Sequence, residues 1–297
     1  MLFLVQDGIT NGAIYALLGL ALVLVFAVTR VILIPQGEFV TYGALSYAML
    51  SAGHVPGTAW LALAMGVVAF VLDLFATRRA LRLKPAGRAF ALNIALPLAI
   101  LALTYLLAGS KTPIAVNIVL ALLIVATIGL FLYRIAFQPI AHTSVLVLLI
   151  ASVGCHLALQ GLGLVFFGNT LMGKALRATA VNRLGARLVG IRTTLSGQIA
   201  FLLASVIGAI SGILIVPITT LYYDTGFLIG LKGFIAAIIG GLVSYPLTAV
   251  AALIVGTVEA FSSFYASNFK EVIVFTLIIP VLVLRSLAAP EVEEEGD

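Results

Sequence analysis

The sequence is poor in charged side chains. Only 9% of its 297 residues are Asp, Glu, Lys or Arg, whereas 63% are hydrophobic, and the mean hydropathy is +1.24. Soluble globular domains carry about 25% charged residues, so this class of protein is excluded. Apolar runs of about 18 residues or more recur along the chain, and each is long enough to cross a bilayer as a helix. We therefore expect a polytopic helical membrane protein.

The apolar runs predict membrane spans at about residues 4–28, 58–76, 90–107, 114–133, 144–167, 197–221, 247–264 and 272–284. In the first span, the Gly8-xxx-Gly12 spacing permits close approach of another helix, so we expect these glycines to serve packing.

Cysteine and histidine are also scarce. The single cysteine, Cys155, lies inside an apolar run, so no disulfide or cysteine-based metal framework can form within the chain. The three histidines form no H-E-x-x-H motif, and no Ser/His/Asp set is evident. We expect His156 to pack in the bundle with one hydrogen bond. No catalytic residue and no metal site are predicted, and an intramembrane enzyme is the least favoured function.

The positive charges are concentrated in two places. Ten of the sixteen Lys and Arg residues fall within residues 78–88 and 174–192. Basic residues gather in cytoplasmic loops, so these clusters are topology signals, and the net charge of +5 does not indicate nucleic-acid binding. We expect a transmembrane domain over residues 1–288, followed by an acidic cytoplasmic tail at 289–297.

The second basic cluster is the most unusual stretch of the chain. Residues 172–192 carry five cations and no acid, and their apolar residues recur at three- and four-residue spacing. Such a segment cannot lie in hydrocarbon, so we expect a cytoplasmic amphipathic helix or helix pair. It is either a solvated loop that fixes the topology or a docking element for a cytoplasmic partner. Gly168–Lys174 fits G-x-x-x-x-G-K, but Ala175 follows where a phosphate-binding loop has Ser or Thr, so no ATP binding is expected here.

Two apolar segments are interrupted by proline or glycine. Pro35 and Gly37 precede a short apolar run at 39–52, with Glu38 at its entry. Broken helices that carry ionisable residues are typical of transport sites and gates. Glu38 is either such a residue or a carboxylate that caps a helix at the membrane surface. The second interrupted segment, residues 226–246, contains several glycines and one lysine.

Lys232 and Glu259 are two further ionisable residues inside apolar runs. An unpaired lysine costs at least about 2.5 kcal/mol at the centre of a membrane helix. Lys232 should therefore face a cavity, an acidic partner or the membrane surface. Asp73, one helical turn before Arg78 and Arg79, is expected to form an ion pair at the membrane interface.

Several of these stretches carry a family pattern. The sequence G-K-A-L-R-A-T-A-V-N-R-L-G-A-R-L-V-G-I occupies residues 173–191, T-R-V-I-L-I-P-Q-G-E-F occupies 29–39, and G-L-K-G-F-I-A-A-I-I-G-G occupies 230–241. They resemble the coupling segment, the interrupted segment and the glycine-rich block of LivH-type permeases, the membrane subunits of ABC importers for branched-chain amino acids. Leu33, Pro35 and Gln36 depart from the usual pattern, so no role of the Asn and His usual in this stretch is transferred.

The resemblance implies an all-α, polytopic integral membrane protein of the bacterial inner membrane, with about nine or ten membrane segments, some of them broken or re-entrant. It implies a subunit that moves branched-chain or other small hydrophobic amino acids by alternating access. The chain itself would hold no cofactor, because ATP and Mg²⁺ would bind separate cytoplasmic ATPase subunits. Its other partners would be a LivM-like second permease subunit, a periplasmic substrate-binding protein and the lipid bilayer. The alternative is a self-contained secondary transporter or channel for a small solute.

The same resemblance suggests which residues serve transport. Coupling to the ATPase is assigned to Gly173, Lys174, Arg177, Ala178, Asn182, Arg183, Gly190 and Ile191. The translocation pathway or gate is expected between the two interrupted segments, with help from the first span, at Gly37, Glu38, Gly230, Lys232, Gly240, Gly241 and Glu259. Glu38 is expected to matter more for gating than for recognition, because a zwitterionic substrate needs one partner for each of its two charges.

The number of membrane crossings is inconsistent with the charges. Three apolar runs, at 90–107, 114–133 and 144–167, separate the two basic clusters, although clusters on one side of the membrane require an even number. Either the third run bends back near Gly161 and Gly163, or one crossing is missing. Because the family carries a further helix after the F-F-G sequence, we expect that this chain lacks a helix between Phe167 and Leu171.

Overall fold

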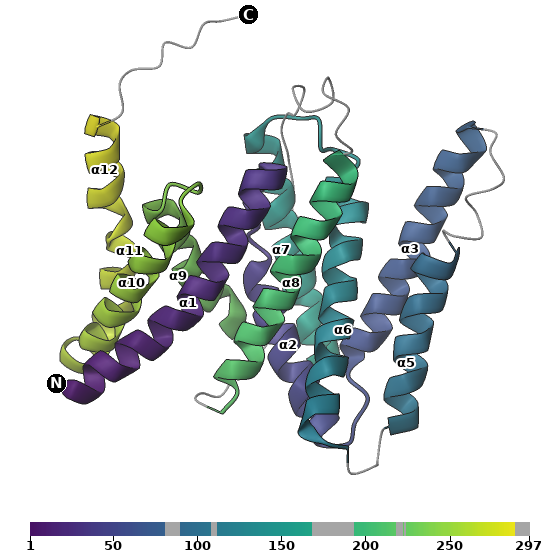
Figure 1. The fold of residues 1–297 in the computed structure, drawn as a ribbon, viewed down its shortest axis with the longest axis horizontal. Helices are drawn as coiled ribbons and strands as arrows, with labels where there is room; N and C mark the ends of the chain where they lie inside the picture. Colours follow the sequence, from purple (N-terminus) through teal and green to yellow (C-terminus); the bar gives the residue numbers. More distant parts are fainter. Residues whose placement is uncertain (81–89, 108–111, 168–192, 218–221, 223, 289–297) are drawn as a thin grey trace, which may run out of the picture. The chain divides into compact units, whose positions relative to one another are not determined.

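The described part of the protein is entirely helical. A computed structural model describes residues 1–80, 90–107, 112–167, 193–217, 222 and 224–288, and no strand occurs among them. In chain order the elements are α1 (Leu2–Thr29), α2 (Gln36–Ser51), α3 (Gly57–Ala80), η1 (Ala91–Ala95), α5 (Leu96–Leu107), α6 (Ile114–Leu132), η2 (Tyr133–Phe137), α7 (Val145–Phe167), α8 (Thr193–Ile215), α9 (Thr225–Ile239), α10 (Tyr245–Tyr265), η4 (Ser267–Phe269), α11 (Lys270–Thr276) and α12 (Ile278–Ala288) (Figure 1). The all-α prediction is confirmed.

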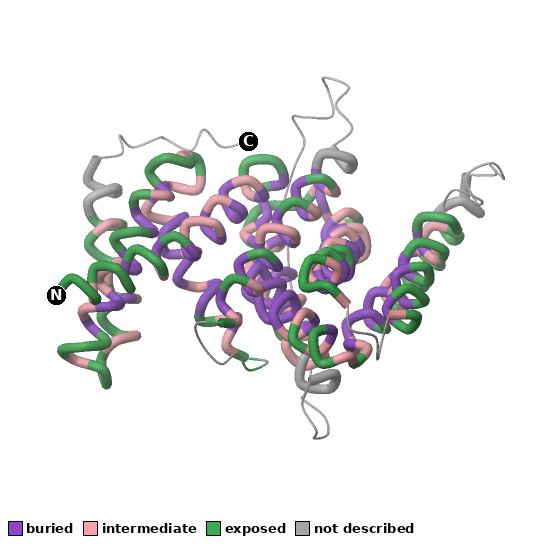
Figure 2. The backbone as a smooth tube through the Cα atoms, turned by 60° about the horizontal axis from the view of Figure 1, so that its bottom comes forward, coloured by how far each residue is buried: buried purple, intermediate pink, exposed green. Residues whose placement is uncertain are grey.

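Six of the described helices are long and apolar enough to cross a membrane: Leu2–Thr29, Gly57–Phe75, Ile114–Phe137, Val145–Leu162, Gly197–Ile215 and Tyr245–Tyr265. Two shorter apolar helices cover Ala91–Leu107 and Thr225–Ile239. Exposed residues, green in Figure 2, run along the helices as well as at their ends, and many of them are large and apolar, such as Val67, Val71 and Leu74 of α3. Apolar side chains exposed along a helix suit contact with lipid, so the chain is a multi-pass membrane protein.

The chain divides into two units, each with its own internal packing. Unit 1 contains Met1–Val23 and Leu231–Asp297, and unit 2 contains Leu24–Gly230. Helices α1 and α9 each have residues in both units.

In unit 2, α2 is a short helix that begins beside the middle of its neighbours. The N–H of Ile34, just before it, donates to Oγ of Ser152 in α7 at 2.8 Å. Nε2 of Gln36 donates to the carbonyl of Ala204 in α8 at 3.0 Å. Ser152 lies about 10 Å along the axis of α7 from its first residue, and residues 35–44 are all buried. The helix break predicted at Pro35 is therefore confirmed, and it lies inside the protein.

The contacts of α2 also give the directions of α7 and α8. Along α2, Ile34 bonds Ser152, whereas Tyr42, two turns later, donates to the carbonyl of Leu159 at 2.5 Å. Helices α2 and α7 are therefore parallel. The same holds for α8, because Gln36 bonds Ala204 and a Cβ built on Gly43 would lie 2.6 Å from Cα of Ala209.

Because α7 and α8 both run parallel to α2, the end of α7 and the start of α8 lie at opposite ends of unit 2. These ends are Phe167 and Thr193. The folded chain therefore agrees with the odd number of apolar runs counted between the two basic clusters, because α7 ends on the side opposite to the start of α8. Helix α7 is continuous through Gly161 and Gly163, so the alternative of a hairpin bent at these residues is wrong. The predicted missing helix lies outside the described residues and stays a prediction.

Two helix ends differ from the predicted spans, and proline explains both. The span predicted for residues 197–221 stops being helical after Ile215, because Pro217 disfavours the helical conformation of the residue before it. The last predicted span, 272–284, is divided into α11 and α12 at Leu277. Pro280 lacks an N–H and its ring clashes with the carbonyl four residues earlier, which is the carbonyl of Thr276.

Asp73 makes a longer-range contact than the sequence suggested. Its Oδ2 lies 2.6 Å from NH2 of Arg134 in η2 and accepts a hydrogen bond from Nδ2 of Asn93 in η1 at 2.8 Å. The contact joins α3 to η1 and η2. The side chains of the predicted partners, Arg78 and Arg79, lie outside the described residues.

Candidate functional site

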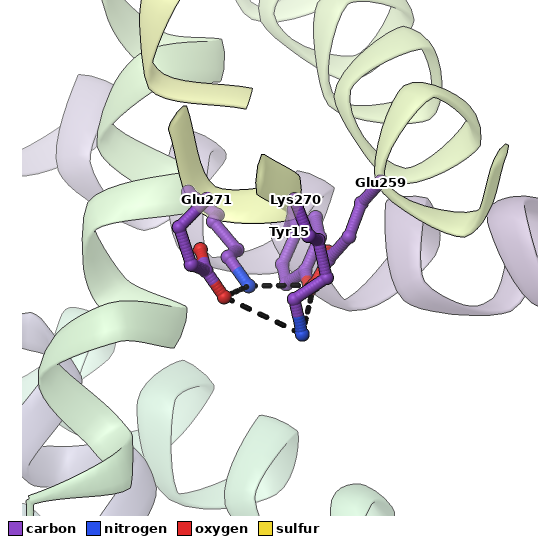
Figure 3. Close-up of polar contacts among 5 residues, drawn as sticks. Tyr15, Glu259, Lys270 and Glu271 are labelled. Carbon is purple, nitrogen blue, oxygen red and sulfur yellow. Dashed lines mark hydrogen bonds and ion pairs between the residues drawn. The ribbon is translucent and has the colours of Figure 1, made fainter. Parts of the chain in front are cut away.

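Unit 1 contains a network of buried and half-buried charges, which we call the ion network: Tyr15 of α1, Lys232 of α9, Glu259 of α10, and Lys270 and Glu271 of α11 (Figure 3). Nζ of Lys232 donates to Oε1 of Glu259 at 2.5 Å and to Oε1 of Glu271 at 3.2 Å. Tyr15 donates its hydroxyl hydrogen to the other oxygen of Glu259, Oε2. Nζ of Lys270 lies 3.4 Å from Oε1 of Glu271 and 3.9 Å from Oε1 of Glu259.

The ion network is charge-balanced, with two lysines and two glutamates. Lys232 and Glu259 are only 4% and 6% exposed, whereas the side chains of Lys270 and Glu271 are 33% and 36% exposed. Of the three surroundings predicted for Lys232, the structure therefore shows an acidic partner. Desolvation of both charges is offset because each has an opposite charge and a hydrogen bond.

Glycines bring the helices of unit 1 close enough to form the ion network. A Cβ built on Gly8 would lie 2.7 Å from Cα of Thr257, and one on Gly12 would lie 2.7 Å from Cα of Leu253. Helices α1 and α10 therefore pack in antiparallel backbone contact, which confirms the packing role predicted for the Gly8-xxx-Gly12 spacing. One turn after Gly12, Tyr15 reaches Glu259.

Gly240 and Gly241 follow the end of α9 and form the interruption predicted within residues 226–246, whereas the helix is continuous through Gly230 and Gly233. Gly241 has φ of 74°, a left-handed conformation that glycine adopts without steric cost. The N–H groups of these glycines donate to the last carbonyls of α9, Gly240 to Ala236 and Gly241 to Ile238. Gly240 also lies against Thr248 of α10, so a side chain there would collide with the threonine.

Unit 2 contains a second buried group, which we call the Glu38 cluster: Glu38 and Thr41 of α2, His156 of α7 and Phe227 of α9. Nδ1 of His156 lies 3.0 Å from Oε1 of Glu38. The His156 and Phe227 rings stack, with centroids 4.3 Å apart and an interplanar angle of 24°. Glu38 and Thr41 are fully buried, and His156 is 3% exposed.

The polar atoms of the Glu38 cluster lack hydrogen-bond partners of good geometry. Both carboxylate oxygens of Glu38, the hydroxyl oxygen of Thr41 and Nδ1 of His156 are buried without a formed hydrogen bond in the described part of the chain. The contact between His156 and Glu38 is close in distance but poorly aligned. A buried polar group without a partner costs about 1–3 kcal/mol, and a charged group costs more. Such groups call for an explanation.

Glycines also shape the Glu38 cluster. A Cβ built on Gly230 would lie 2.8 Å from Cα of Gly37, and one on Gly226 would collide with the backbone of Gly37 and the hydroxyl of Thr41. The first turns of α2 and α9 are therefore in backbone contact. This contact turns Thr41 toward α9, the helix whose Phe227 covers His156.

The predicted pathway residues fall into both groups. Gly37, Glu38 and Gly230 lie together in unit 2, whereas Lys232, Gly240, Gly241 and Glu259 lie in unit 1. That they line one pathway stays a prediction. The predicted coupling residues, between Gly173 and Ile191, lie outside the described residues.

Sequence reasoning missed six residues of these two groups: Tyr15, Thr41, His156, Phe227, Lys270 and Glu271. His156 was expected to pack with one hydrogen bond. Its Nδ1 lies 3.0 Å from Oε1 of Glu38 but forms no hydrogen bond of good geometry. The acid–base pair at the start of the last apolar run, Lys270–Glu271, was the signal for the outer part of the ion network. Tyr15 and Thr41 carry no charge and gave no signal.

Comparison with known proteins gives consistent matches. A family described as "branched-chain amino acid transport system / permease component" matches residues 4–282. The chain is 30% identical over 308 residues to the high-affinity branched-chain amino acid transport system permease protein LivH of Salmonella typhimurium and to that of Escherichia coli K12, covering 97% of this chain and 96% of each relative. It is 33% identical over 142 residues to BraD of Pseudomonas aeruginosa, covering 44% and 46%. No solved structure matches.

Proposed function

Because the chain belongs to the family of permease components of branched-chain amino acid transport systems, we propose that it moves branched-chain or other small hydrophobic amino acids across a bacterial inner membrane. The observation that carries this proposal is the match over nearly the whole length of both chains. The half-helix α2 with its buried Glu38 supports it, because broken helices with buried ionisable residues are typical of transport proteins.

The chain would act as the membrane subunit of an ABC importer. Separate cytoplasmic ATPase subunits would bind ATP and Mg²⁺, a second permease subunit would complete the pathway, and a periplasmic protein would deliver the substrate. The basic segment 173–191 is the part proposed to contact the ATPase. Its sequence predicts an amphipathic, positively charged helix, and such a segment can receive force from a soluble subunit. Gly37, Glu38 and Gly230 are proposed to belong to the gate.

Reconstitution tests the proposed function. Proteoliposomes would contain the chain with ATPase subunits and a second permease subunit from the same organism, and the binding protein would be supplied outside. We expect uptake of radiolabelled leucine that requires ATP inside and the binding protein outside. The self-contained alternative predicts gradient-driven uptake by this chain alone, and that result would replace the importer assignment.

The coupling role has a test of its own. We expect the charge reversals Arg177→Glu and Arg183→Glu to lower ATP-dependent leucine uptake about tenfold, equivalent to about 1.4 kcal/mol of coupling free energy, while the ATPase activity continues. The matched control is Arg82→Glu in the other basic cluster, which should leave coupling unchanged. Normal coupling in both reversed variants would show that this segment serves only as a topology signal.

A further inference from the structure

The Glu38 cluster differs from an ordinary core because its unsatisfied atoms are mainly hydrogen-bond acceptors. Glu38 contributes two carboxylate oxygens, and Thr41 contributes one hydroxyl oxygen. Nδ1 of His156 lies 3.0 Å from Oε1 of Glu38 but forms no hydrogen bond of good geometry with it. No Lys or Arg side chain of the described residues pairs with Glu38. The site therefore offers negative charge and free acceptors, and it would attract a cation that carries N–H donors.

The spacing of the two acceptor residues suits a small donor group. Residues 38 and 41 are three apart on α2, which places their Cβ atoms about 5–6 Å from each other on one helix face. A single nitrogen atom at an ordinary hydrogen-bond distance of about 2.8 Å from each of two oxygens can bridge oxygens up to about 5.6 Å apart, so side chains on neighbouring turns can share one donor group. A primary ammonium group has three N–H donors and no acceptor, which matches a carboxylate with a neighbouring hydroxyl.

The surroundings of the cluster favour the same chemistry. The Phe227 ring stacks on His156, so the cluster contains an aromatic ring, and aromatic rings attract a nearby cation. The start of α9 contacts the backbone of Gly37 in α2 through Gly226 and Gly230, which have no side chains. The Glu38 cluster therefore lies where the backbones of these two helices meet. Because the cluster is shielded from solvent, a ligand enters only when these helices move apart.

We propose that the Glu38 cluster binds a primary ammonium group, and that this group is the α-ammonium of the transported amino acid. The inference rests on the proposed function. It assigns Glu38 recognition of one half of the zwitterion in addition to its place in the gate, and so replaces the expectation from the sequence that Glu38 serves gating more than recognition. Glu38 and Thr41 accept hydrogen bonds from the ammonium, and His156 holds the carboxylate when the site is empty. The substrate carboxylate binds elsewhere.

Binding to the purified importer complex, without the periplasmic protein, tests the proposal. The probes are leucine, isoamylamine, which keeps the ammonium and lacks the carboxylate, and 4-methylpentanoate, which does the reverse. We expect leucine and isoamylamine to raise the thermal unfolding temperature at millimolar concentration. Glu38→Gln should abolish the effect of isoamylamine. Thr41→Val should weaken isoamylamine binding about tenfold, since it removes one hydrogen bond to a charged group.

The matched control is Thr127→Val in α6, because Thr127 is buried like Thr41 but donates to the carbonyl of Leu123 at 2.7 Å. It should leave isoamylamine binding unchanged. If Glu38→Gln does not fold, Thr41→Val decides the question. Unchanged isoamylamine affinity in Thr41→Val, or no isoamylamine binding by the wild-type complex, overturns the proposal.

Two further arms separate the possible failures. Sodium and potassium chloride test a metal cation in place of the ammonium, and stabilisation by either that depends on Glu38 also overturns the proposal. ATP-dependent leucine uptake by the wild-type complex is measured in parallel. Uptake without isoamylamine binding removes only the present inference, whereas absence of uptake removes the proposed function.

Discussion

The ion network of unit 1 and the Glu38 cluster of unit 2 each contain a buried glutamate, but the two glutamates differ in their hydrogen bonding. Glu259 and Glu38 are both buried, but Glu259 has bonds from Lys232 and Tyr15 on its two oxygens, whereas Glu38 has only a poorly aligned histidine. A buried charge whose hydrogen bonds are all formed makes the surrounding fold rigid and specific. A buried charge that lacks these bonds lowers the stability of the protein, and such a loss of stability is typical of residues that serve function. The comparison therefore assigns a structural role to the ion network and a binding role to the Glu38 cluster.

The largest effect is expected for Lys232→Met. It leaves Glu259 buried with only Tyr15 and the more distant Lys270, and breaking a buried ion pair costs about 3–5 kcal/mol. We expect low abundance in membranes and a large fall in the unfolding temperature of detergent-solubilised protein. The double variant Lys232→Met, Glu259→Leu removes both charges and should recover much of the loss. Wild-type stability in Lys232→Met would end the structural interpretation of the network.

A smaller loss is expected for Tyr15→Phe. The variant keeps the ring and deletes the hydroxyl that donates to Oε2 of Glu259, and a hydrogen bond to a charged group contributes about 1.5–3 kcal/mol. Thermal unfolding in detergent measures the change. Tyr105→Phe is the control, because the Tyr105 ring packs edge-on against Trp60 at an exposed position. Equal stability of the two variants would show that the bond to Glu259 contributes little.

The comparison is sharpest where the two glutamates are changed in the same way. Glu38→Gln removes an inadequately paired buried charge and should raise stability by about 1 kcal/mol, while transport falls. Glu259→Gln should lower stability instead, since it leaves Lys232 with Glu271 alone. Unfolding temperatures of both variants, measured beside leucine uptake, check the signs. Destabilisation by Glu38→Gln would mean that its contact with His156 is a strong ion pair.

The sequence predicted the elements of this fold better than their contacts. The break before α2 followed from Pro35 and Gly37, because both residues act on the local backbone. The end of α8 before Pro217 was misplaced, although the same local rule applies, because the hydrophobic run continues past it. Lys232 was predicted to face a cavity, an acidic partner or the membrane surface, because the cost of burying its charge depends on that one residue alone.

The partners themselves could not be predicted, because they depend on how the helices are rotated against one another. Lys232 bonds Glu259 on another helix, and His156 contacts Glu38, which lies far away in the sequence. Apolar periodicity is weak in helices that are hydrophobic on all sides, so the sequence does not show which face of α7 meets α2. Backbone contacts such as that of Gly230 with Gly37 determine these rotations. The spacing of glycines in the sequence shows that a helix has a close-packing face, but it does not show which helix packs there.

The smallest effect is expected at the outer edge of the ion network. Lys270 is 33% exposed and lies 3.4 Å from Glu271 and 3.9 Å from Glu259, so water screens its charge. Exposed ion pairs contribute about 0.2–1 kcal/mol. Lys270→Met should therefore change the unfolding temperature only slightly, whereas Lys232→Met in the same network should lower it strongly. Because both variants remove one lysine charge, their difference isolates the effect of burial. If Lys270→Met proves as damaging as Lys232→Met, the network depends on its total charge, and the geometry around Glu259 is not what holds it together.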